Sequence, residues 1–217
     1  MKQICFIPMN CLSYLLSVIP SFSQLLPITA FVAILVFMTK EILEWRRRSA
    51  ADARKIRALK KVLARDCELN YWAMTQLSDT LTKMRESGVS EDASRISISK
   101  RAGGGFLVMV EDGDGSGGGG MLPSIQRDAL LKHLVEIAAL DESFYAKCES
   151  ALDGLSEADH VHQSLVHGPD KHFPSTPENY YEGLIDYGLG ELNDSAAKLK
   201  NLYLACTGSE LKRGKLR

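Results

Sequence analysis

Residues that break helices are missing from a long part of this chain. No glycine occurs before Gly88, and no proline occurs between Pro27 and Pro123. Their absence removes the usual sites of turns and kinks from residues 28–87, which are rich in Ala, Leu, Arg, Lys, Glu and Met. The sequence therefore predicts one long helix over this stretch.

Signatures of catalysis, nucleotide binding and zinc binding are also missing. The five cysteines form no C-x-x-C pair, and no GK[ST] sequence closes the glycine-rich stretch at residues 111–120. We therefore expect reduced cysteines in the core, no cofactor, and a protein that is not an enzyme.

Two short stretches come closest to a metal site. The loop from Asp112 to Gly120 matches the first positions of a calcium-binding EF-hand, but Pro123 stands where the bidentate glutamate is required. Four histidines lie between His160 and His172, at spacings that do not place a set of zinc ligands on one side of a helix. We expect an acidic glycine-rich linker at the first stretch, and a solvated helix end and loop at the second.

What the sequence does contain is a long apolar run. It extends from Leu25 to Trp45, with charged residues only at positions 40, 41 and 44. These 21 residues make about 31 Å of helix, which matches a hydrocarbon core of about 30 Å. We predict a transmembrane helix over residues 25–45. The alternative, a core helix of a soluble protein, is disfavoured by the basic residues that follow directly. The predicted membrane-interface residues are Trp45, Arg46, Arg47 and Arg48.

Basic residues flank the predicted anchor on one side. Ten Lys and Arg residues lie in residues 40–65, at and after the C-terminal end of the predicted anchor, whereas only Lys2 precedes the anchor. The positive-inside rule therefore predicts a single-pass membrane protein with its N-terminus outside and its C-terminal head in the cytoplasm. In residues 1–24 the apolar part, 4–19, is too short to cross alone. We expect an interfacial segment rather than a second crossing, and a re-entrant hairpin with the anchor is the alternative.

A second apolar pattern follows the arginines. Residues 46–88 predict a basic amphipathic stalk helix in which apolar residues recur three or four positions apart, as in a coiled coil. Asn70 would fix the register of such an oligomer. A helix packed on its own domain explains the pattern equally well. The predicted oligomerisation seam comprises Ile56, Leu59, Leu63, Asn70, Leu77 and Leu81.

Beyond the stalk the sequence changes character. Within residues 89–122, β-branched and apolar residues at 95–100 and 106–110 predict a β-hairpin, followed by the glycine-rich linker. Residues 208–217 form a basic tail. The expected fold class is mainly α: a single-pass transmembrane helix continuing into the stalk, with a small cytosolic helical bundle carrying one hairpin.

Residues 123–207 predict that bundle. Asp141 is expected to cap one helix, and a further helix is expected to open at Ser156. Gly168 and Gly208 each follow the expected end of a helix. The last helix is expected to start at residues 176–178.

Charge is distributed unevenly along the chain. Residues 40–65 carry a net charge of +7, and residues 66–217 carry −9. We expect the basic part to contact a lipid bilayer with anionic headgroups and the acidic head to dock an unidentified cytosolic protein; nucleic acid is a weaker candidate.

Two functions agree with these features. The first is a membrane-anchored, non-enzymatic interaction or scaffold protein that forms homo-oligomers through its stalk helix. The alternative is a membrane-perturbing effector, pore-forming or holin-like, controlled by its cytosolic head.

Overall fold

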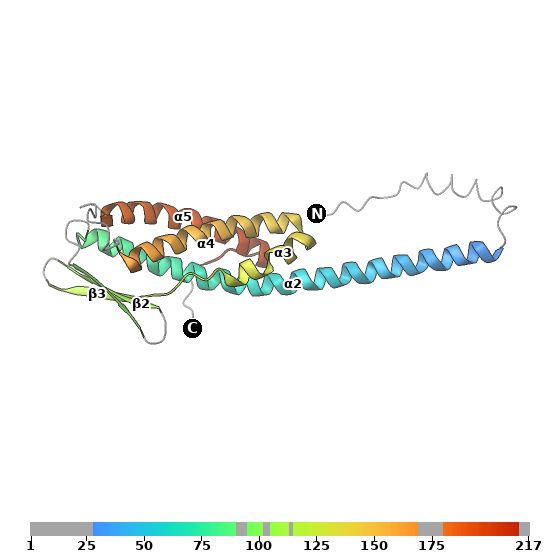
Figure 1. The fold of residues 1–217 in the computed structure, drawn as a ribbon, viewed down its shortest axis with the longest axis horizontal. Coiled ribbons are helices and arrows are strands. Elements are labelled where there is room, and N and C mark those ends of the chain that lie inside the picture. Colours follow the sequence, from blue (N-terminus) through green and yellow to red (C-terminus); the bar gives the residue numbers. More distant parts are fainter. Residues whose placement is uncertain (1–27, 90–94, 102–104, 113–114, 169–179, 213–217) are drawn as a thin grey trace. The chain divides into compact units, whose positions relative to one another are not determined.

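The computed structural model describes residues 28–89, 95–101, 105–112, 115–168 and 180–212. Contacts between residues divide the chain into two units, Met1–Ala53 and Arg54–Arg217. The division lies within the first described helix, α2 (Ile28–Glu86), shown in Figure 1. We therefore describe the two parts of α2 separately, residues 28–53 and residues 54–86.

Helix α2 is the long helix that the missing glycines and prolines predict, and it runs for 59 residues. Its uncharged part comprises only residues 28–39, about 18 Å of helix, because Lys40 and Glu41 follow. Among the described residues, no helix is both long and apolar enough to cross a membrane. The transmembrane helix predicted over 25–45 is therefore wrong, and the single-pass location inferred from it is wrong with it. Residues 25–27 of that prediction lie outside the described residues.

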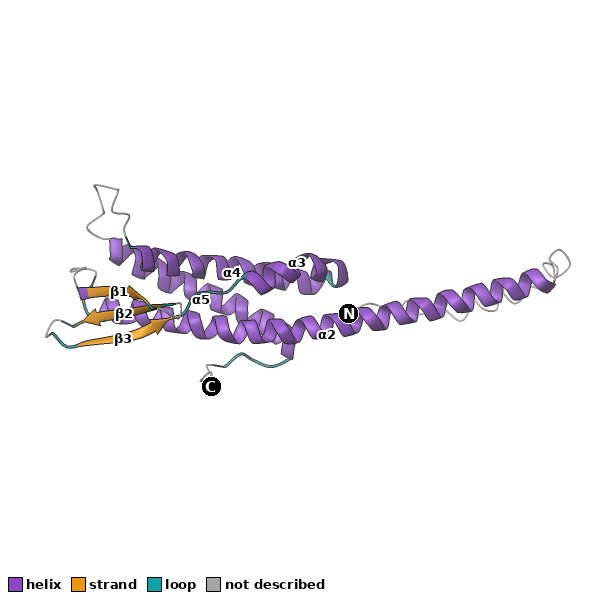
Figure 2. Ribbon diagram, turned by 60° about the horizontal axis from the view of Figure 1, so that its bottom comes forward, coloured by secondary structure: helices purple, strands orange, loops and turns teal. Residues whose placement is uncertain are grey.

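The second unit is built mainly from helices. The second part of α2 packs with α3 (Asp128–Leu140), α4 (Glu142–His167) and α5 (Tyr180–Thr207). Figures 1 and 2 both show α4 and α5 lying alongside this part of α2. In this arrangement each of these helices buries its apolar face against the others.

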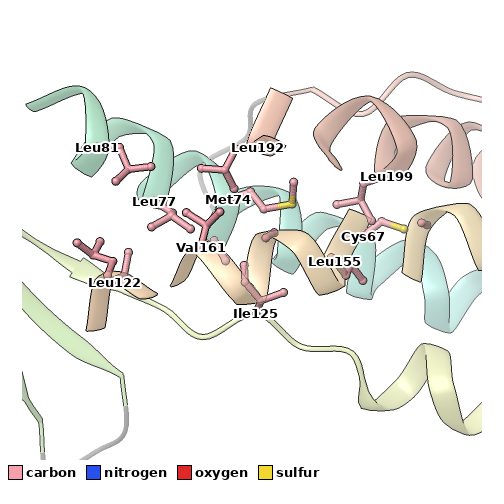
Figure 3. Packing of buried hydrophobic residues seen from close by; sticks show 14 of the residues in the cluster. Cys67, Met74, Leu77, Leu81, Leu122, Ile125, Leu155, Val161, Leu192 and Leu199 are labelled. Atoms are coloured by element: carbon pink, nitrogen blue, oxygen red, sulfur yellow. The ribbon is translucent and has the colours of Figure 1, made fainter. Parts of the chain in front are cut away.

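The core of this unit lies where the three long helices meet. Leu77 of α2, Val161 of α4 and Leu192 of α5 are at most 3% exposed, and Figure 3 shows them close together. Gly188 of α5 lets the helices approach. A Cβ at that position would lie 2.8 Å from Leu81 Cδ1 and 2.9 Å from Val161 Cγ1, so no larger residue fits without movement.

Helix ends follow the predicted signals in most places. The Asp141 carboxylate caps α4 by accepting hydrogen bonds from Phe144 N at 3.2 Å and Ser143 Oγ at 2.8 Å. Helices α4 and α5 are followed by Gly168 and Gly208, which have φ values of 65° and 74°. These three predictions are confirmed.

Two expectations about helix boundaries have different outcomes. The predicted break before Ser156 is wrong, because α4 continues through this residue and the Ser156 hydroxyl donates to Leu152 O at 2.9 Å. The predicted start of the last helix at residues 176–178 lies outside the described residues.

The sheet is antiparallel, with the order β1-β2-β3 seen in Figure 2. Its strands are β1 (Ile96–Lys100), β2 (Phe106–Glu111) and β3 (Gly117–Leu122). Strands β1 and β2 form the predicted hairpin, in which Lys100 pairs with Phe106. Strand β3 lies where we predicted a linker, because four consecutive glycines give no strand signal.

Candidate interaction surfaces

A large exposed apolar surface lies on the first part of α2. Its large apolar residues are between 49% and 84% exposed. A helix that is apolar on all sides normally lies buried, and an apolar patch this extensive marks an interaction site. The exposed large apolar residues of this part are Ile28, Phe31, Val32, Ile34, Leu35, Val36, Phe37, Met38, Ile42, Leu43 and Trp45.

Six of these residues lie on one heptad seam, which we call the first seam. Their spacings alternate between three and four residues, so they occupy the a and d positions of a coiled coil. Continued with the same alternation, the register passes two polar positions, Ser49 and Asp52, and then arrives at Ile56, Leu59 and Leu63. Our sequence interpretation missed this continuity because it assigned the apolar run to lipid. The first seam comprises Ile28, Phe31, Leu35, Met38, Ile42 and Trp45.

Opposite charges flank the first seam. Glu41 occupies a g position and Arg46 the e position five residues later. In a parallel coiled coil these positions face each other across the two helices, so the pair would be attractive. Glu44 and Arg48, by contrast, pair within one helix, with Arg48 Nη2 2.8 Å from Glu44 Oε1.

The four predicted membrane-interface residues, Trp45 to Arg48, lie on this exposed part of α2. Trp45 is 70% exposed. The proposed contact of these residues with lipid headgroups depended on the transmembrane helix, which the structure contradicts. In the heptad register, Trp45 instead ends the first seam, and Arg46 flanks it.

The predicted oligomerisation seam of the stalk is buried inside its own chain. The packing partners come from the second unit, as in the alternative of an amphipathic helix on its own domain. These residues are thus covered without a second copy. Leu59, Leu63, Asn70, Leu77 and Leu81 are at most 6% exposed, and Ile56 is partly buried against the same core.

Asn70 has a specific partner within the chain. Its Nδ2 donates to Gln126 O, and its Oδ1 accepts from Gln126 N, both at 2.8 Å. Because both backbone groups of Gln126 are engaged, the side-chain amide attaches the segment before α3 to α2. Asn70 therefore bonds within its own chain, whereas the sequence interpretation expected it to fix the register of an oligomer.

Cysteine thiols in the second unit are held in their protonated form. Burial raises the pKa of Cys67, and it raises the pKa of Cys148 to about 12 and of Cys206 to about 11. A thiol that stays protonated at neutral pH is a poor nucleophile and a poor metal ligand. These residues therefore serve packing.

His162 is buried in the core beneath the sheet. It is 1% exposed, and its ring centroid lies 6.1 Å from that of Phe106 in an edge-on arrangement. Within the described residues, neither ring nitrogen has a hydrogen-bond partner. Burial is the main cause that lowers the pKa of His162, and nearby Asp159 opposes it. The neutral ring therefore packs as a core side chain.

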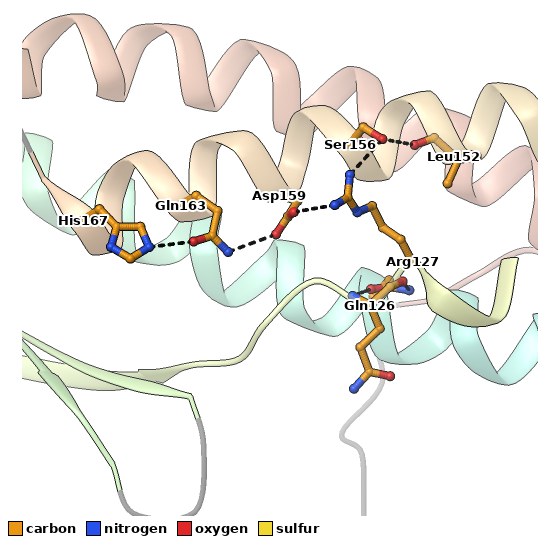
Figure 4. Close-up of polar contacts among 8 residues, drawn as sticks. Gln126, Arg127, Leu152, Ser156, Asp159, Gln163 and His167 are labelled. Carbon is orange, nitrogen blue, oxygen red and sulfur yellow. Dashed lines mark hydrogen bonds and ion pairs between the residues drawn. The ribbon is translucent and has the colours of Figure 1, made fainter. Parts of the chain in front are cut away.

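The other polar residues near the histidines bond to one another along α4, as Figure 4 shows. Arg127 Nη2 lies 3.2 Å from Asp159 Oδ2, Gln163 Nε2 donates to Asp159 Oδ1 at 3.4 Å, and His167 Nε2 lies 2.9 Å from Gln163 Oε1. No group of three metal-ligating side chains occurs in the described part of the chain. His172 and residues 113–114 of the acidic loop lie outside it.

Comparisons with protein families, with characterised proteins and with solved structures find no significant match. The geometry defines a mainly helical protein with a small antiparallel sheet.

Proposed function

We propose that this chain is a non-enzymatic interaction or scaffold protein that forms homo-oligomers through the first seam. Residues 54–217 would then bind a partner protein. The observation that carries the proposal is the exposed apolar surface from Ile28 to Trp45, which follows a coiled-coil register. This moves the site of oligomerisation from the stalk seam, which is buried in its own chain, to the preceding part of α2.

A second copy of the chain suits this surface for three reasons. The alternation of a and d residues is self-complementary, so two or more identical helices can interdigitate along it. The charges of Glu41 and Arg46 favour parallel copies in register. Most side chains of the first seam are about half exposed, so burying the rest of each contributes about half of the 1.5–3 kcal/mol that full burial gives, against about 0.5–1 kcal/mol of side-chain entropy for Ile or Leu.

A non-enzymatic role agrees with the state of the reactive groups. The thiols of Cys67 and Cys148 are protonated, and the imidazole of His162 is packed under Phe106. General acid–base catalysis requires a group that reaches substrate, which these buried side chains do not.

The proposed partner surface lies on residues 66–217, beyond the basic start of the second unit. These residues carry a net charge of −9, which favours a partner with a basic surface. The expected contact is between proteins.

Two neighbouring substitutions test self-association. Ile42 lies on the first seam and Leu43 beside it, and the two residues are 53% and 51% exposed. Sedimentation velocity of the full chain should show an oligomer. Ile42→Glu should shift it to the 23.9 kDa monomer, because a charge enters the seam. Leu43→Glu, with the same charge added one position away, should retain the oligomer.

Three outcomes would overturn the proposal. A wild-type chain that stays monomeric at all accessible concentrations removes the basis for self-association. Equal dissociation of both variants shows that the heptad register does not determine the contact. A monomer that instead binds phospholipid vesicles assigns the apolar surface to lipid rather than to a second copy.

A further inference from the structure

Strand β3 presents an edge of the sheet. It pairs with β2 on one side, and within the described residues no strand pairs with its other side. Along any strand, alternate residues direct their N–H and C=O groups to opposite edges. Neither Lys nor Pro, the residues that commonly protect an edge, occurs in β3.

A groove lies between this edge and α2. It has a volume of about 300 Å³. One wall is the α2 surface that includes Gln76, Thr80 and Lys83, and the floor includes Val108 and Val110 of β2. The glycines of β3 complete the lining, so the groove opens along the strand.

The groove exists because two positions of β3 have no side chain. Gly118 pairs with Val110 and Gly120 with Val108, so both glycines lie on the helix-facing side of the sheet. A Cβ at either position would meet no atom within 4 Å. On the outer face the space is filled, because a Cβ at Gly119 would collide with the Met109 side chain.

We infer that this groove binds an extended peptide of a partner protein, which adds to β3 as a fourth strand. Its backbone would bond to the outer edge of β3, and alternate side chains would enter the space beside Gly118 and Gly120. The valines of the floor suit β-branched apolar side chains.

Charge at one end of the groove indicates a basic residue in the peptide. Glu86 lines the groove, and Glu111 ends β2 opposite Gly117. Asp112 is held at the end of α2 by the Ser87 hydroxyl, which donates to Asp112 Oδ1 at 2.6 Å. Two cations are also near: Lys83 lines the groove, and Arg95 Nη1 donates to Ser87 O at 2.7 Å. The carboxylates outnumber them, so a Lys or Arg at this end is favoured.

A peptide with side chains fits better than a second copy of β3. The glycines of a second β3 would place no side chains over the space beside Gly118 and Gly120, so the groove would remain unfilled. The groove therefore requires a different strand, and it is independent of the first seam on α2.

The binding test uses a designed probe with the full chain. The probe is a fluorescein-labelled peptide, Lys-Val-Thr-Val-Thr-Val-Lys, which places a lysine beside Glu111 in either strand direction. Fluorescence anisotropy should show saturable binding. The control peptide has the same sequence with the backbone nitrogens of its third and fourth residues methylated. It lacks an N–H donor on both strand edges and should bind at least tenfold more weakly.

A variant that fills the groove tests whether the peptide binds there. The variant Gly118→Val/Gly120→Val should weaken binding of the probe at least tenfold. Its melting temperature should not fall, because both added side chains enter open space. The control Met121→Val changes a 46% exposed residue of the same strand, outside the groove, and should leave affinity unchanged. If the double-glycine variant does not fold, Thr82→Tyr narrows the groove from the exposed helix wall without changing its charge and should weaken binding in the same way.

Several results would overturn the inference. These are no binding of the probe at millimolar concentration, equal binding of the two peptides, and undiminished binding by the groove-filling variants. Self-association that is lost in Gly118→Val/Gly120→Val would instead assign the edge to a second copy.

Discussion

The two parts of α2 share one heptad register but lie in different surroundings. Leu35, on the first seam, is 52% exposed, whereas Leu77, six seven-residue repeats further along the same register, is 0% exposed. Helices α4 and α5 cover the second part within its own chain, and no described residue covers the first part to a similar degree. A heptad pattern thus identifies a buried face without identifying what buries it.

The largest expected difference between the two parts is in core stability. Leu77→Ala should lower the free energy of unfolding by about 2–5 kcal/mol, because it leaves a cavity among packed helices. Leu35→Ala should change the same quantity by less than about 0.5 kcal/mol in the dissociated monomer. Urea unfolding of dilute full-length chain measures both, and equal losses would show that the first part also packs within its own chain.

Asn70 distinguishes an intrachain contact from an interchain one. Asn70→Ala should lower the free energy of unfolding by about 1–3 kcal/mol, because it removes a buried amide whose two hydrogen bonds hold the backbone N–H and C=O of Gln126. Gln126→Ala is the control, since only the backbone of Gln126 takes part. A change in molar mass by light scattering, without loss of stability, would return Asn70 to an oligomer interface.

Two glycines of α5 test how closely the second part of α2 is packed. Gly188→Ala should cost about 1–3 kcal/mol of unfolding free energy, since its Cβ would press on Leu81 and Val161. Gly190→Ala, two positions away in open space, should add about 0.5–1 kcal/mol through helix propensity. Thermal unfolding measures both changes, and a stabilising Gly188→Ala would contradict the packing.

Acid should lower the stability of the second unit through His162 of α4, without changing self-association through the first seam. Burial lowers the pKa of His162 in the folded chain, so the unfolded chain, with a pKa of about 6.5, binds more protons. The stability contributed by neutral His162 is present above pH 6.5 and is lost as pH falls below it, by at most about 1.4 kcal/mol per pH unit. Below the lowered pKa of the folded chain the loss levels off.

Unfolding at pH 7.5 and 5.5 checks this prediction. The pH dependence should be smaller in His162→Leu than in the wild type, whereas His160→Leu, at an exposed position, should retain it. Self-association should not change with His162, because residues 28–45 contain no histidine. An unchanged pH dependence in His162→Leu would contradict the assignment.

The smallest expected effect concerns the direction of the helices in the oligomer. Glu41→Arg and Arg46→Glu should each raise the dissociation constant about two- to fivefold at low salt, because like charges would then face each other. The double variant Glu41→Arg/Arg46→Glu should restore affinity if the copies are parallel. Sedimentation equilibrium measures the three constants, and failure of the double variant to restore affinity would exclude the parallel arrangement while leaving self-association intact.

Local signals in the sequence predicted much of this fold. Missing helix breakers predicted α2, the Asp141 carboxylate predicted the start of α4, and alternating residues predicted the β1–β2 hairpin. Strand β3 was missed because its pairing comes from β2 and not from its own glycines.

The surroundings of α2 were harder to predict. An apolar helix face has the same pattern whether lipid, another copy or its own chain covers it, and the transmembrane helix predicted from that pattern was wrong. For residues 56–81 the partners are α4 and α5, which follow more than fifty residues later in the sequence. The local sequence pattern of α2 therefore does not identify these distant partners.

The central claim is that one register serves contacts between copies in residues 28–45 and contacts within one chain in residues 56–84. Hydrogen–deuterium exchange of the full chain at several protein concentrations tests it most directly. Protection of amides in 28–45 should fall on dilution as the oligomer dissociates, while protection in 56–84 should stay constant. Protection that is independent of concentration in both parts, or that falls in both together, would contradict the claim.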